Sequence, residues 1–124
     1  MNSSLYAATI LLALSCAASA QNVKEALLAE GGGLNADWTC DSAGGGRAET
    51  GRSELTFKEE GSKVVVDVNN GSRGSCKSDV DVADSGATFK GCRGTPVQMT
   101  PDANDKSVPF IGKGGACTYK FKRK

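Results

Sequence analysis

The sequence contains no histidine, and this absence excludes several kinds of enzyme site. Without an imidazole the chain cannot form a Ser-His or Cys-His nucleophile pair, a histidine general base or a histidine metal site. A pair of carboxylates could still hydrolyse a substrate, but nothing in so small a domain indicates the cleft that such a pair needs. We therefore expect a protein that is not an enzyme and that binds no metal or cofactor.

Aromatic residues are scarce, and the charges almost cancel. The 124 residues include one Trp, two Tyr and four Phe, and 15 Lys and Arg stand against 14 Asp and Glu, which leaves a net charge of +1. A chain of this length forms one small domain, and small domains have little hydrophobic core to stabilise them. A net charge so close to zero does not indicate nucleic acid as a partner.

The sequence has only one long hydrophobic run, residues 5–18. A helix that spans a membrane needs about 20 apolar residues, and this run is shorter. The small residues Ala-Ser-Ala follow at 18–20 and are typical of a signal peptidase site, so we interpret residues 1–20 as a cleaved signal peptide and the protein as secreted or periplasmic. An alternative is a lipoprotein, because residues 13–16 loosely resemble a lipoprotein box that would place the lipid on Cys16.

Four cysteines follow the predicted signal peptide, an even number that favours two disulfides in an exported chain. No pair has the C-x-x-C spacing of a zinc site. Cys40 and Cys117 alternate with apolar residues on the first and last predicted strands, whereas Cys76 and Cys92 flank a predicted hairpin of residues 77–91. This pattern predicts the pairs Cys40–Cys117 and Cys76–Cys92.

The chain changes its hydrophobic period at residue 34. Residues 23–30 could form a short helix that ends at three glycines, so residues 21–33 are predicted as a helix and a glycine linker. From residue 34 to 124, β-branched and aromatic residues alternate with polar ones between Gly, Asn, Asp and Ser clusters. This pattern predicts an all-β domain, a small antiparallel barrel or sandwich of about six or seven strands.

The clearest predicted hairpin joins residues 53–59 to residues 62–68. A turn at residues 60–61 would place Phe57 opposite Val64 and would put the apolar residues of both strands on one face.

Two glycine-rich or polar segments, residues 41–52 and 100–115, are predicted to be loops. Rigid strands that hold loops often present binding residues, and arginine and aromatic side chains contribute strongly to interfaces. We therefore predict a monomeric binding protein for a protein or surface ligand, which would act through these loops or an open sheet edge. The candidate binding residues are Arg47, Arg52, Phe110 and Lys113.

Three short segments resemble parts of the periplasmic inhibitors of C-type lysozyme. They are Trp-Thr-Cys at 38–40, Ser-Gly-Ala-Thr-Phe at 85–89 and Lys-Gly at 113–114 ahead of the last cysteine. Phe89 stands where that family has Tyr, and Ile111 stands where it has Trp. The resemblance implies a secreted hydrolase inhibitor as an alternative function. A second alternative is an envelope-associated structural protein held by lipidated Cys16 or by the basic residues 120–124.

Two further motifs have competing interpretations. Acidic clusters at residues 79–84 and 102–105 could supply oxygen ligands to calcium, but the spacing of an EF-hand is absent and solvated carboxylates are the simpler interpretation. The sequence Asn-Gly-Ser at 70–72 is an N-glycosylation sequon, and it would matter only in a host that glycosylates asparagine.

Overall fold

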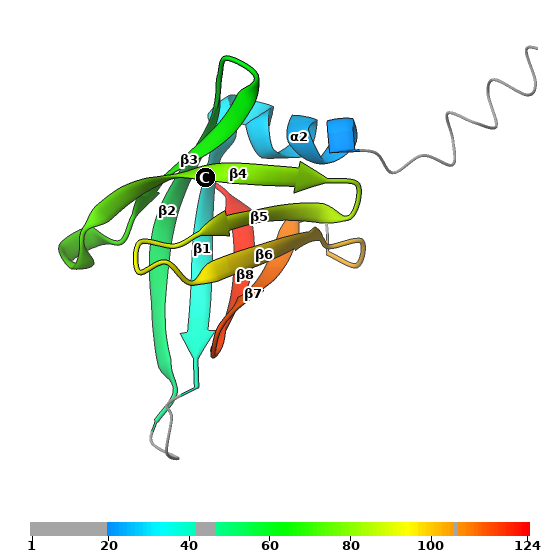
Figure 1. Cartoon of the computed structure of the whole chain (residues 1–124). Coiled ribbons are helices and arrows are strands. Elements are labelled where there is room, and N and C mark those ends of the chain that lie inside the picture. The colour runs from blue at the N-terminus through cyan, green and yellow to red at the C-terminus, as the bar shows by residue number, and fades with distance from the viewer. Residues whose placement is uncertain (1–19, 42–46, 106) are drawn as a thin grey trace, which may run out of the picture.

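The computed structural model describes residues 20–41, 47–105 and 107–124, which form an eight-stranded, closed antiparallel barrel (Figure 1). Each strand pairs with its neighbour in sequence, and β1 closes the barrel by pairing with β8. The prediction of an antiparallel β domain is confirmed, although there are eight strands where six or seven were expected. The strands are β1 (Gly33–Cys40), β2 (Glu49–Glu60), β3 (Lys63–Asn69), β4 (Ser75–Ala83), β5 (Gly86–Lys90), β6 (Pro96–Pro101), β7 (Phe110–Gly114) and β8 (Cys117–Arg123).

The strand that the sequence pattern misses is β7, which lies inside the predicted loop 100–115. Its sequence, Phe-Ile-Gly-Lys-Gly, has two glycines and low intrinsic strand preference. It becomes a strand because β6 and β8 pair with it on either side. The predicted loop 41–52 is also too long, since β2 already begins at Glu49.

The closed barrel corrects the expectation of an open sheet edge. Each of the eight strands in the described ranges pairs with a neighbour on both sides, so none of them is an edge strand along its whole length. The basic residues 120–123 belong to β8, which pairs with both β1 and β7.

The turn between β2 and β3 lies one residue later than the sequence predicts. Glu60 pairs with Lys63, so Gly61 and Ser62 form the turn, and Phe57 lies opposite Val66 instead of Val64. Gly61 has a φ of 64°, which suits the first position of a tight hairpin turn that needs a positive φ there. Moving the pairing by two residues leaves every side chain on its predicted face.

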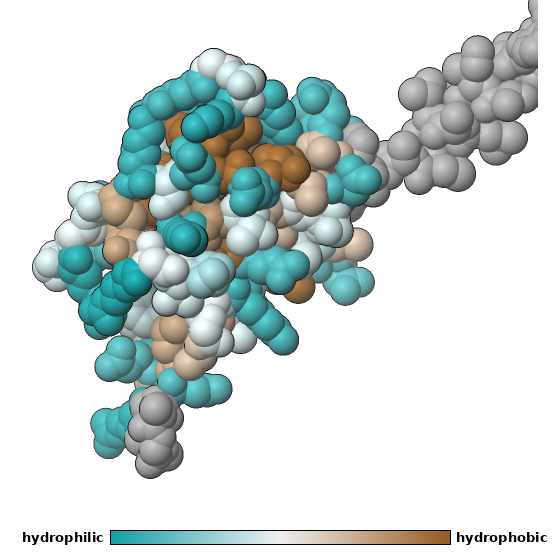
Figure 2. Space-filling model, in the orientation of Figure 1, coloured by the Kyte–Doolittle hydropathy of each residue, from teal (hydrophilic) through white to brown (hydrophobic). Residues whose placement is uncertain are grey.

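Helix α2 (Ala20–Leu28) closes one end of the barrel (Figure 1). Its Val23 and Leu27 are buried in the same core as the inward-facing residues of the strands. The helix is fixed at that end by a salt bridge of 2.9 Å from Lys24 to Glu59. Hydrophobic residues gather where the helix meets β3 and β4 (Figure 2).

The helix begins before the predicted residue 23 and is not followed by a free glycine linker. It passes into a 3-10 turn (η1, Ala29–Gly32), and β1 starts at the next residue. The chain reverses there through left-handed backbone at three successive residues, Glu30, Gly31 and Gly32. A Cβ on Gly32 would lie 1.9 Å from the Phe57 carbonyl oxygen, so only glycine fits this approach.

Arg123 binds the last carbonyl groups of α2, and its loss should loosen the helix. Its guanidinium donates hydrogen bonds to the carbonyl of Ala26 in α2 at 2.6 Å and to that of Ala29 in η1 at 3.4 Å, near the helix end where carbonyls lack later helical partners. We expect Arg123→Met to lower the free energy of unfolding by about 1.5 kcal/mol and to speed amide exchange in α2. Lys124→Met is the control, because Lys124 forms only a surface ion pair with Glu54. Equal exchange rates in the two variants would contradict this role.

The two disulfides are Cys40–Cys117 and Cys76–Cys92, which confirms both predicted pairs. The first joins residues directly opposite each other on β1 and β8, and the second joins β4 to the turn after β5. Both lie near the strand ends that are remote from α2. Among the described residues, no helix is long and apolar enough to cross a membrane.

Candidate binding site at the mouth of the barrel

A cavity of about 590 Å³ opens at the end of the barrel remote from α2. We call this open end the mouth; its rim consists of residues 70–74, 91–95 and 115–116, which connect successive strands. The floor of the cavity is apolar, because inward-facing core side chains form it. These are Ala36, Leu55, Val68, Phe89, Val97 and Phe121.

The rim carries an aromatic ring and a guanidinium in contact. Arg73 lies over the Trp38 indole, with its guanidinium carbon 5.3 Å from the ring centroid, a distance at which cation and ring attract. A carboxylate oxygen of Glu49 lies 4.0 Å from the same guanidinium. Arg52 and Arg93 also line the mouth, which therefore has three arginines and one glutamate, and Arg52 is paired with Asp37 on the outer face.

A polar pair lies deeper in the wall of the mouth. Ser53 faces inward from β2 with only 7 % of its surface exposed, and it is the one buried polar residue among those described. Its hydroxyl donates a 2.5 Å hydrogen bond to the side-chain oxygen of Asn70. The Asn70 N–H in turn donates to the Gly74 carbonyl, which holds the rim loop in place. The sequon asparagine is therefore half-buried and hydrogen-bonded through its side chain.

Two aromatic side chains complete the wall. Trp38 packs over Gly51 so closely that a Cβ there would lie 2.2 Å from the indole, which explains a glycine inside a long strand. Tyr119 stacks on Phe121, with ring centroids 5.7 Å apart. Burial raises the pKa of the Tyr119 phenol, so this group stays neutral at physiological pH.

A second cavity, of about 920 Å³, lies on the outer face of the barrel. It is formed by outward-facing side chains of β2, β1, β8, β7 and β6, and we call it the outer groove. Five residues of the barrel wall line both cavities: Trp38, Thr50, Gly51, Arg52 and Tyr119.

The structure separates the four predicted binding residues. Arg52 and Lys113 come together in the outer groove, although both are strand residues and not loop residues. Arg47 is exposed ahead of β2 and lines neither cavity. Phe110 is 0 % exposed on β7, so its assignment to a binding loop is wrong.

The set predicted from the sequence lacks several residues of the mouth, among them Ser53, Asn70 and Arg73. Ser53 had a usable signal, since it is a polar residue at an inward position of an alternating strand. Asn70 follows β3 directly and continues the β2–β3 register opposite Ser53, so the predicted hairpin would have indicated it only with the correct turn. Arg73 had no signal, because its contact with Trp38 depends on how the loop after β3 folds.

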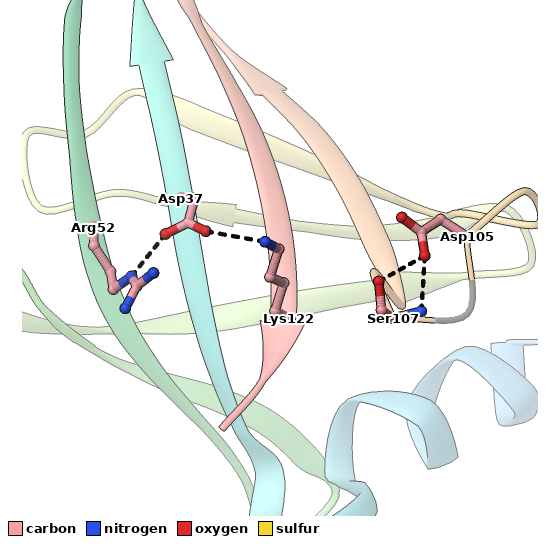
Figure 3. Close-up of polar contacts among 5 residues, drawn as sticks. All are labelled: Asp37, Arg52, Asp105, Ser107 and Lys122. Atoms are coloured by element: carbon pink, nitrogen blue, oxygen red, sulfur yellow. Dashed lines mark hydrogen bonds and ion pairs between the residues drawn. The ribbon is translucent and has the colours of Figure 1, made fainter.

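Asp37 is held by two cations on the neighbouring strands (Figure 3). Arg52 donates a hydrogen bond to it at 2.7 Å, and Lys122 lies 3.7 Å away. The Arg52 hydrogen bond holds the pKa of the Asp37 carboxyl below its ordinary value of 3.8.

This lowered pKa gives a pH-dependent prediction. A carboxyl with a depressed pKa in the folded protein stabilises it above pH 4, and the contribution disappears as the pH falls through the folded-state pKa. We expect Asp37→Asn to cost under about 1 kcal/mol at pH 7, since the pair is partly exposed, and nothing at pH 2. Urea unfolding at both pH values measures the difference. A cost that persists at pH 2 would contradict the prediction, and Asp81→Asn on exposed β4 is the control.

The carboxylates of the acidic cluster at 102–105 accept hydrogen bonds from neighbouring residues of the same loop. The Asp102 carboxylate accepts the Asn104 N–H, and the Asp105 carboxylate accepts both the N–H and the hydroxyl of Ser107 (Figure 3). These hydrogen bonds lower the pKa of Asp105. Within the described ranges, no group of three or more acidic or cysteine side chains is arranged to hold a metal ion.

No known protein family, no curated protein and no solved structure matches this chain. The fold and site define a class of architecture, a small barrel plugged at one end and open at the other. A fold alone does not fix a function, and the chemistry of the mouth is more informative.

Proposed function

We propose that this protein is an exported, non-catalytic binding protein that holds a small amphipathic molecule in the mouth of its barrel. The observation that carries this proposal is the cavity of about 590 Å³, with an apolar floor and a polar rim. An eight-stranded barrel has an interior just wide enough to be filled by side chains or to hold one small ligand. Apolar pockets with a few polar groups are the usual sites for small molecules.

The lining indicates the chemistry of the ligand. The floor favours an alkyl or aryl body, whereas Arg73 and Arg93 at the rim favour an anionic end such as a carboxylate or sulfonate. Arg73 is already held over Trp38, so less side-chain entropy is lost when an anion binds. The neutral Tyr119 phenol adds a hydrogen-bonding group without adding negative charge.

Export is part of the same proposal. Disulfides persist in oxidising compartments, and this chain has two of them close to the mouth. We propose that residues 1–20 are a signal peptide removed on export, with lipidation at Cys16 as the alternative; both concern residues that lie, apart from Ala20, outside the described ranges. The mass of the exported protein distinguishes a chain that begins at Gln21 from a heavier one that begins at a modified Cys16.

The inhibitor alternative gains no specific support from the arrangement of its segments. Phe89 is buried in the floor of the mouth, whereas Lys113 lies on the outer face of β7. Ser85 lies in the turn between β4 and β5, at the end of the barrel that α2 closes. Trp38 and Lys113 both line the outer groove, but the segment 85–89 lies elsewhere, so the three resembling segments do not form one surface.

Trp38 makes the proposal directly testable, because it is the only tryptophan in the chain and lines the mouth. Linear alkyl carboxylates of 6 to about 14 carbons would be titrated into the disulfide-bonded protein while Trp38 fluorescence is followed. We expect one molecule bound per chain and an affinity that rises with each added CH₂, at about 0.8 kcal/mol per buried group, until the cavity is full.

Two comparisons test the role of the rim. Arg73→Gln should weaken carboxylate binding at least fivefold, whereas Lys63→Gln, which removes the same charge from the outer face of β3, should leave it unchanged. Alkyl trimethylammonium ions of equal length should bind more weakly than the carboxylates. An affinity that does not depend on Arg73, on the chain length of the ligand or on its charge would refute the proposal.

A further inference from the structure

The outer groove is built from two rows of side chains that run across five strands. The pairing of β2, β1, β8, β7 and β6 aligns Arg52, Asp37, Lys120, Ile111 and Thr100 in one row. The adjacent row consists of three threonines, Lys113 and Gln98. These rows present hydroxyl, amide and ammonium groups over a cavity of about 920 Å³.

The lining of the groove has three cationic side chains and one carboxylate. Asp37 is its only carboxylate, and Arg52 and Lys122 already contact it. Lys113 and Lys120 form no salt bridge with any described residue, although both lie on the groove. On the outer faces of β2, β3 and β4 the situation is the opposite, because the lysines there are paired. Those pairs are Lys58–Asp67, Lys63–Asp79 and Lys77–Glu60.

The groove also contains an exposed apolar side chain. Ile111 is 41 % exposed and is the one large hydrophobic residue at the surface of the described part of the chain. It lies between Lys120 and Thr100 in its row and is a neighbour of Lys113 along β7. An apolar contact enclosed by unpaired ammonium groups matches an apolar side chain enclosed by carboxylates.

We propose that the outer groove docks an extended acidic segment of a partner protein. Carboxylates of that segment would contact Lys113 and Lys120, and one apolar side chain would contact Ile111. A lipid surface is a poorer match, since only one large apolar side chain is exposed there. Nucleic acid is a poorer match too, because Asp37 lies within the groove and the net charge of the chain is only +1. This proposal does not depend on ligand binding in the mouth.

The experiment is a selection from a random 12-residue peptide library displayed on phage. The disulfide-bonded wild-type protein is the target, and peptides that bind the charge-reversed Lys113→Glu/Lys120→Glu variant are first removed. We expect the surviving peptides to be enriched in Asp and Glu around an apolar residue. Survivors without acidic enrichment, or the absence of survivors, would overturn the proposal.

A matched control separates a local site from a general effect of charge. Lys63→Glu/Lys90→Glu changes the net charge equally on β3 and β5, outside the groove. Selected peptides should bind Lys113→Glu/Lys120→Glu at least tenfold more weakly than wild type and should bind the control within twofold of wild type. Equal losses in both variants would overturn the proposal.

Two further measurements distinguish the occupants and the two cavities. Heparin is added as a competitor of the selected peptides. If heparin displaces them, binds with equal or higher affinity and requires the same two lysines, the groove is a site for polyanions and the proposal is overturned. Ile111→Ser should weaken binding of the peptides at least threefold and should not change binding of heparin. Lys113→Glu/Lys120→Glu should leave the binding of alkyl carboxylates in the mouth unchanged, and Arg73→Gln should leave the binding of peptides in the groove unchanged. Either proposal can therefore fail without the other.

Discussion

Replacing Phe110 with alanine is expected to lower the free energy of unfolding by about 3–5 kcal/mol, whereas replacing its neighbour Ile111 should change it by less than about 0.5 kcal/mol. Phe110 is fully buried and lies opposite Phe121, so the truncation leaves a cavity between packed side chains. Ile111 lies on the outer face and is 41 % exposed. Urea unfolding followed by Trp38 fluorescence measures both values on the same protein.

The pair of variants tests how β7 is oriented. In a closed barrel, adjacent residues of a strand face opposite sides of the wall. Substituting two neighbouring apolar residues with alanine must therefore lower the free energy of unfolding by different amounts. Similar costs for Phe110→Ala and Ile111→Ala would mean that this segment is the loop that its glycines suggest. A stability loss confined to Ile111→Ala would mean that the strand faces the other way.

The parts of the fold that the sequence predicts correctly are those set by local alternation. Leu34, Ala36, Trp38 and Cys40 recur at every second position of β1 and do face inward. The Cys40–Cys117 pair follows from the same rule, because both cysteines fall on the inward faces of the two strands that close the barrel. The Cys76–Cys92 pair follows instead from the position of its cysteines on either side of the hairpin of residues 77–91. Local pattern is informative here because one face of each strand is buried.

The formation of β7 depends on pairing with other strands and cannot be predicted from the local pattern of residues. The glycines of β7 carry no strand preference, and the strand exists only because β6 and β8 supply hydrogen bonds on both sides. Without β7 the sheet would keep an open edge, which is the expectation that the sequence supports.

The sequence predicts some residues of the candidate sites, but it does not predict which of them lie in the same cavity. Arg52 and Lys113 are 61 positions apart in sequence, and they reach the same groove only because β1 and β8 lie between their strands. Arg73 meets Trp38 because the loop after β3 folds over the mouth. A sequence can nominate arginines and aromatic residues, but the closure of the barrel determines which of them share a cavity.

The disulfide at the closing seam should be the main covalent contribution to stability. Every other pair of strands in the barrel is adjacent in sequence, so β1 and β8 are the pair that must meet across nearly the whole chain. Cys40–Cys117 spans 77 residues and Cys76–Cys92 spans 16. Restricting the unfolded chain by these loops corresponds to about 4 and about 3 kcal/mol respectively.

We therefore expect Cys40→Ser/Cys117→Ser to lower the free energy of unfolding by about 4 kcal/mol and to raise the urea m-value, because the unfolded chain becomes less compact. Cys76→Ser/Cys92→Ser is the matched control and should cost about 1 kcal/mol less. Far-ultraviolet circular dichroism should stay unchanged in both variants below the transition, since the effect acts mainly on the unfolded state. If the seam variant cost no more than the control, closure of the barrel would not depend on this bridge, and the packing of Phe110 against Phe121 would have to hold β7 and β8 in place.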